Sequence, residues 1–131
     1  MIGLATNVLV RYLTQDDPAQ SAKAAEILEK RLSEDHPGFI SVVVMVETVW
    51  VLERAYGFSA QEIAAAIERI LQTGVLVVES EQDVFTAMIA YRAGAGAFAD
   101  VLIGALAVRA GCSHTLTFDR KAARLPGFAL G

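Results

Sequence analysis

The chain contains one cysteine, two histidines and three prolines in 131 residues. Its single cysteine, Cys112, cannot form an internal disulfide and is expected to be a small buried apolar residue. Two distant histidines and one cysteine do not have the spacing of a zinc site. No apolar run approaches the roughly 20 residues that span a bilayer, and no basic leader with a long apolar stretch opens the sequence. We therefore expect a cytoplasmic protein with no membrane partner.

Positive charge is also scarce. The sequence has eleven Lys and Arg residues and fifteen Asp and Glu residues, so the formal net charge is −4. Such a surface is not suited to indiscriminate binding of polyanions, and any contact with nucleic acid must be local. Apolar residues are abundant at 54%, which is typical of a folded globular protein. The length predicts a single domain over residues 1–131, with a core that needs no disulfide or structural metal.

Short apolar runs alternate with helical patterns along the chain. The predicted strands cover residues 2–5, 39–40, 75–78 and 114–118. The predicted helices cover residues 6–13, 18 to near 37, 42–56, 60–73, 82–93 and 100–110. This alternation, without repeats or linkers, predicts a three-layer α/β/α sandwich with a short parallel sheet.

Several of these helices have capping signals. Asp17 precedes a proline, Ser41 precedes the helix over residues 42–56, and Ser59 with Glu62 fits a capping box. The start of the helix over residues 42–56 is rich in β-branched residues and could form a strand, but its apolar pattern continues too long for one.

Three acidic residues lie in apolar settings, whereas most of the others fit caps, turns or polar helix faces, Asp83 among them. Glu47 interrupts a helix apolar enough to be largely buried, and Asp100 heads another apolar helix. Asp119 follows a strand expected in the middle of the sheet, at the edge where such folds bind ligands. Gathered carboxylates need a compensating cation, and oxygen ligands without histidine or cysteine suit Mg²⁺ or Mn²⁺. A metal held in this way can activate water and promote phosphodiester hydrolysis.

Each of these residues also has a purely structural interpretation. Asp100 could cap its helix, Asp119 could cap the turn over residues 120–124, and Glu47 could pair with Arg54 or Arg92. Thr6 and Asn7 could form a capping pair or support the metal ligands.

The basic residues are concentrated near the C-terminus. Residues 109–131 contain four basic residues and a single acidic one, Asp119. The basic residues are Arg109, Arg120, Lys121 and Arg124. This group could guide an RNA backbone toward an acidic site, or it could be a solvated turn.

Four segments resemble the PIN-domain ribonucleases, and within them the VapC-like toxins of type II toxin–antitoxin systems. In chain order they read MIGLATNVLVRYL, VETVWVLER, FADVLIGALA and LTFDRKA. The resemblance implies a Mg²⁺- or Mn²⁺-dependent endoribonuclease that forms a homodimer. It also implies a cognate antitoxin whose C-terminal segment blocks the site, with operator DNA contacted only through that antitoxin.

The resemblance breaks at one position. Glu47, Asp100 and Asp119 match three of the family's four acidic residues, with Thr6 and Asn7 in support, but Ala5 stands where the family has aspartate. Two explanations remain open: a deliberate inactivating substitution, which we prefer because the surrounding motifs are intact, or a natural protein that binds without cutting. Either way, we expect weak metal binding and poor cleavage.

A rival prediction is a non-catalytic interaction module in which the acids bind a partner's arginines. A receiver-type phosphoacceptor domain fits less well, because the adjacent acidic pair that it requires at the first strand is missing.

Overall fold

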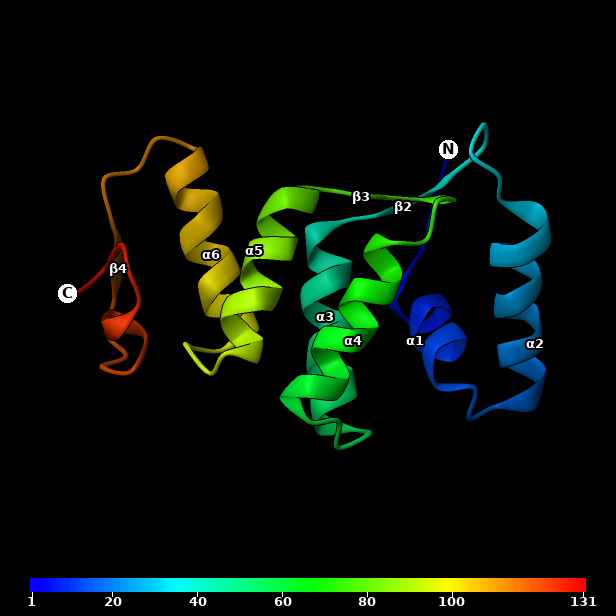
Figure 1. Ribbon diagram of the computed structural model, residues 1–131, viewed down its shortest axis with the longest axis horizontal. Coiled ribbons are helices and arrows are strands. Elements are labelled where there is room, and N and C mark those ends of the chain that lie inside the picture. The colour runs from blue at the N-terminus through cyan, green and yellow to red at the C-terminus, as the bar shows by residue number, and fades with distance from the viewer. The chain divides into compact units, whose positions relative to one another are not determined.

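The computed structural model describes residues 1–131, which form two compact units, Met1–Glu81 and Gln82–Gly131. Figure 1 shows the helices and strands along the chain. No helix has the length and apolar character needed to cross a membrane.

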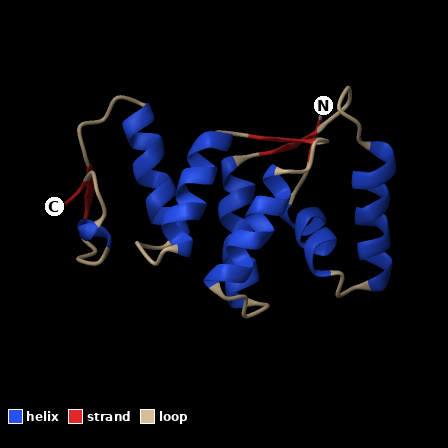
Figure 2. Cartoon of the chain, in the orientation of Figure 1, coloured by secondary structure: helices blue, strands red, loops and turns tan.

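The first unit contains a sheet of three short parallel strands, which Figure 2 shows in red. The strands are β1 (Ile2–Gly3), β2 (Gly38–Ile40) and β3 (Leu76–Val78), in that order across the sheet. Ile2 pairs with Gly38 in the first ladder, and Gly38 pairs with Leu76 in the second. Because parallel neighbours cannot be joined by a tight hairpin, helices connect them.

Four α-helices belong to this unit: α1 (Thr6–Thr14), α2 (Pro18–Glu26), α3 (Val42–Arg54) and α4 (Ala60–Leu71). The caps predicted for α2, α3 and α4 are confirmed. Asp17 accepts a hydrogen bond from the Gln20 backbone, Ser41 accepts one from Val44, and the capping box at the start of α4 is complete. The core is formed by side chains that are at most 2% exposed, including Leu9, Ile40, Met45, Leu52, Ile63 and Ile67.

The second helix ends earlier than predicted. After α2 the chain forms one π-helical turn, η1 (Ile27–Arg31), and Leu32 is already extended. Ser33 and His36 then exchange backbone hydrogen bonds in a turn that leads to β2. The prediction that this helix reaches Pro37 was therefore wrong by about two turns, because a local turn replaces the last helical residues.

The second unit contains α5 (Glu81–Arg92), α6 (Phe98–Arg109), β4 (Thr115–Thr117), the 3-10 turn η2 (Ala122–Arg124) and β5 (Phe128–Leu130). Tyr91 packs edge to face on the buried Phe98, with ring centroids 6.3 Å apart. Gly104 allows α6 to approach β5, since a Cβ there would lie 2.5 Å from a ring carbon of Phe128.

The strands of the second unit pair in parallel, with Thr115 opposite Phe128. Every strand pair in the chain is thus parallel, which confirms the predicted α/β class with short parallel sheets. The sequence did not predict β5, which pairs with β4 in a two-stranded sheet within the second unit. The expected place of β4 in the middle of a larger sheet stays a prediction.

Candidate functional site

Ala5 occupies the N-cap of α1, directly after β1. Its backbone is extended, with a φ of −83° and a ψ of 163°, and its carbonyl accepts hydrogen bonds from the Val8 and Leu9 backbones. No side chain caps this helix. The alternative in which Thr6 and Asn7 form a capping pair was therefore wrong, because both lie inside the helix. A methyl group stands at the position where an aspartate side chain would accept a backbone hydrogen bond.

Thr6 connects the start of α1 to α3. Its hydroxyl donates a hydrogen bond to Oε1 of Glu47, and Thr6 itself is only 8% exposed. Glu47 is exposed, although the helix that carries it was expected to be largely buried. The core side of α3 is formed by other positions of the helix: Met45, Thr48, Val49 and Leu52.

Glu47 makes no ion pair with Arg54. The Arg54 guanidinium lies over the Trp50 ring instead, 5.8 Å from its centroid. The Glu47 carboxylate therefore has a neutral hydroxyl as its partner.

A cavity of about 470 Å³ opens in front of Thr6 and Glu47. It is lined by Ala5, Thr6, Asn7, Val10, Arg11, Glu47, Val51, Ala55 and Tyr56. We call Ala5, Thr6, Asn7 and Glu47 the N-terminal site.

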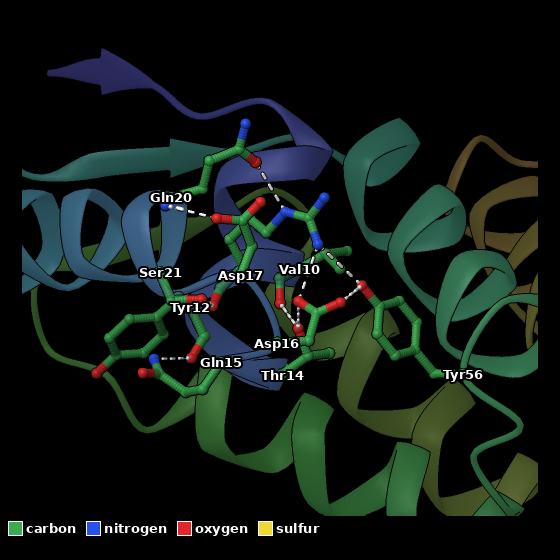
Figure 3. Close-up of polar contacts among 10 residues, drawn as sticks. Val10, Tyr12, Thr14, Gln15, Asp16, Asp17, Gln20, Ser21 and Tyr56 are labelled. Atoms are coloured by element: carbon green, nitrogen blue, oxygen red, sulfur yellow. Dashed lines mark hydrogen bonds and ion pairs between the residues drawn. The ribbon is translucent and has the colours of Figure 1, made fainter.

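A hydrogen-bonded cluster adjoins this cavity (Figure 3). The Asp16 carboxylate accepts hydrogen bonds from Tyr56, Thr14 and Arg11, at 2.7, 2.8 and 2.8 Å. These bonds lower the pKa of Asp16 to about 2, with the Tyr56 hydroxyl making the largest contribution. The cluster joins the end of α1 to the end of α3, the two helices that carry Thr6 and Glu47.

Asp100 lies in the first turn of α6, as the third residue of the helix. The helix begins at Phe98 with Ala97 as its N-cap, so the alternative in which Asp100 is the cap was wrong. A carboxylate in the first turn still interacts favourably with the helix dipole.

Asp119 follows β4 and organises the turn after it, as its structural interpretation proposed. Its Oδ1 accepts a hydrogen bond of 2.8 Å from the Lys121 backbone, and its own N–H donates to Thr117 Oγ1 at 3.0 Å. The bond from Lys121 orients the carboxylate and engages only Oδ1, so Oδ2 is available to a ligand, while the bond to Thr117 fixes the backbone of Asp119.

Asp100 and Asp119 line the same cavity, which has a volume of about 310 Å³. The remaining walls are Gly94, Ala95, Gly96, Ala97, Lys121, Ala122 and Leu125. We call Asp100, Asp119 and Lys121 the C-terminal site. Arg120 and Arg124, the other two basic residues proposed to contact RNA, are exposed and do not line it.

The donor chemistry of the C-terminal site suits a hard divalent cation. Two carboxylates border a cavity with room for water, and four small residues form much of its wall. Such a site favours Mg²⁺ or Mn²⁺, which keep several waters when a protein supplies few ligands. Within either unit taken by itself, no three acidic, histidine or cysteine side chains gather around one point.

One acidic residue with an important contact was missed. Asp83, which was assigned to a polar helix face, is only 6% exposed and accepts two hydrogen bonds from Arg109, at 2.5 and 3.0 Å. These bonds link α5 to α6 and raise the pKa of Arg109. The sequence held a sign of this burial, because Asp83 lies next to Val84 and one helical turn before Ala87, which are both core residues. Cys112 is exposed, so its expected burial was also wrong.

The family model of the PIN domain matches residues 4–127. The chain belongs to the PIN-domain family. PIN domains are generally metal-dependent nucleases with an α/β/α fold, and the match runs through both compact units and includes both sites. No curated protein matches the chain significantly. The single domain over residues 1–131 stays a prediction.

Proposed function

We propose that this PIN-domain protein is the toxin of a toxin–antitoxin pair, and that its fold is that of a Mg²⁺- or Mn²⁺-dependent endoribonuclease that Ala5 impairs. One observation carries the proposal. Asp100 and Asp119 share a cavity, while Glu47 is held by Thr6 beside Ala5, at the family's four acidic positions.

The metal ligands are assigned by the resemblance to the family. Asp100, Asp119 and Glu47 would hold the metal, which when bound would supply an activated water and neutralise charge on the phosphodiester. Thr6 fixes the Glu47 carboxylate through its hydroxyl, and the Lys121 backbone fixes that of Asp119. Asn7 lines the N-terminal cavity and offers an amide to the ligands or to RNA.

Position 5 would have two roles in an active enzyme. An aspartate at the N-cap would accept a backbone hydrogen bond from α1 and also present a carboxylate beside Glu47. Alanine removes both, so it leaves the fold intact and weakens the metal site. Both a deliberate substitution and a natural loss of activity are compatible with this geometry.

The test is cleavage of a long single-stranded RNA of mixed sequence, with and without Mn²⁺. Ala5→Asp should raise metal-dependent cleavage by orders of magnitude. Ala5→Asn is the matched control, because asparagine caps a helix as well as aspartate but carries no charge. Both variants should gain about 1 kcal/mol of stability over the original chain from the cap. Equally low cleavage by Ala5→Asp and Ala5→Asn would refute the proposal.

The proposed partners are an antitoxin and a second copy of the chain, in the cytoplasm, with operator DNA bound only through the antitoxin. An apolar groove on α3 supports a protein partner: Val42, Val43, Val46 and Trp50 line it together with Glu47. Val43 is 74% exposed and Trp50 is 56% exposed. Light scattering of the purified chain tests the homodimer, and a monomer would exclude it.

The second candidate is a non-catalytic interaction module. The methyl group at position 5 and the apolar groove on α3 favour it, since neither serves catalysis. A thermal shift separates the two, because a metal that binds only the folded state raises the melting temperature. No Mn²⁺-dependent shift in Ala5→Asp would favour the interaction module.

A further inference from the structure

We propose that Lys121 is a substrate-binding residue of the C-terminal site, where its ammonium group binds a non-bridging oxygen of the RNA phosphodiester next to the metal. This inference rests on the proposed nuclease function. It assigns this role to Lys121 and not to the neighbouring Arg120 and Arg124.

The geometry ties Lys121 to the acidic residues. Lys121 lines the cavity that Asp100 and Asp119 share, and its backbone N–H donates to Asp119 Oδ1 at 2.8 Å. Its side chain is exposed and forms neither of the chain's two ion pairs. Lysine carries its ammonium on a flexible four-carbon chain, and we place this group over the cavity that the residue lines.

The charges of the site lead to the same role. Within the second unit, Asp100 and Asp119 carry two negative charges, and Lys121 offsets one of them. A bound divalent cation would add two positive charges, and a phosphodiester would then bring one negative charge. Any further carboxylate that holds the metal contributes equally with and without Lys121, so the lysine always makes the site more positive by one charge. Lys121 therefore weakens metal binding by repulsion and strengthens RNA binding by attraction.

The other basic residues of the second unit have different surroundings. Arg109 is held by Asp83, and the cavity is lined by none of the three remaining arginines, Arg92, Arg120 and Arg124. Arg120 immediately precedes Lys121 and is equally exposed, so it provides a matched control for a general loss of positive charge.

The experiment compares Lys121→Met, Lys121→Arg and Arg120→Met in the Ala5→Asp background. MnCl₂ alone is titrated into each protein by calorimetry, and RNA cleavage is measured separately at saturating Mn²⁺. Lys121→Met should bind Mn²⁺ roughly tenfold more tightly and show a KM for RNA roughly tenfold higher. Lys121→Arg should retain the parental KM, and Arg120→Met should change neither quantity by more than about twofold.

The decisive result is that Lys121→Met should bind Mn²⁺ more tightly but RNA more weakly, because a purely structural loss would weaken both metal and RNA binding. Weaker binding of both in Lys121→Met, or values equal to those of Arg120→Met, would overturn the inference while leaving the nuclease function standing. An Ala5→Asp parent that neither binds Mn²⁺ nor cleaves RNA would instead refute the proposed function, and this inference with it.

Discussion

The N-terminal and C-terminal sites differ in what holds their carboxylates. In the N-terminal site, Glu47 is held by the side chain of Thr6, and the neighbouring position 5 has no functional group. In the C-terminal site, Asp119 is held by the backbone of its own turn, and a second carboxylate and a lysine line the same cavity. The N-terminal site therefore has a positioned ligand but too little charge, whereas the C-terminal site has the charge needed to attract a cation.

The largest effect is expected from the C-terminal site. In the Ala5→Asp background, Asp119→Asn should reduce RNA cleavage about a thousandfold, because it removes one of the two charges that face the cavity. Glu81→Gln, which removes an exposed carboxylate outside both sites, is the control. Cleavage by Asp119→Asn at the level of this control would show that the C-terminal site holds no catalytic metal.

A smaller effect is expected from the residue that positions Glu47. In the same background, Thr6→Val should lower Mn²⁺ affinity about tenfold, because it keeps the shape of the side chain and removes the hydroxyl that Glu47 accepts from. The exposed Thr86→Val is the control. Calorimetry with equal affinities for the two variants would mean that Thr6 does not serve the site.

The smallest effect concerns the cluster beside the N-terminal cavity. The pKa of Asp16 is lowered in the folded protein to about 2, so its contacts stabilise the fold above the ordinary value near 3.8 and lose this effect as the pH falls toward 2. Tyr56→Phe removes the largest cause and should move the Asp16 titration midpoint upward. Carboxyl NMR of both proteins measures this, and an unchanged midpoint would contradict the assigned cause.

Local signals in the sequence predicted local structure well. The Ser59 and Glu62 capping box and the Ser41 cap depend on residues within one helical turn, and both are present in the structure. In contrast, β5 is a strand because it pairs with β4, which no pattern within residues 128–130 could reveal.

Burial was harder to predict than secondary structure. The pattern of α3 is apolar on most sides, so it does not indicate which side faces the core, and Glu47 lies on the exposed one. The packing of α5 buried Asp83, whose partner Arg109 lies 26 residues later in the chain. The candidate ligands could be named from motifs, but the hydroxyl that holds Glu47 and the cavity that Asp100 and Asp119 share required the structure.

Calorimetric titration of Mn²⁺ into the Ala5→Asp and Ala5→Asn proteins tests the central claim most directly, since the two differ in charge at position 5 and share the helix cap. The account predicts at least roughly tenfold tighter binding by Ala5→Asp. Equal affinities, or no binding by either protein, would contradict the claim that this chain carries a metal site from which one carboxylate is missing.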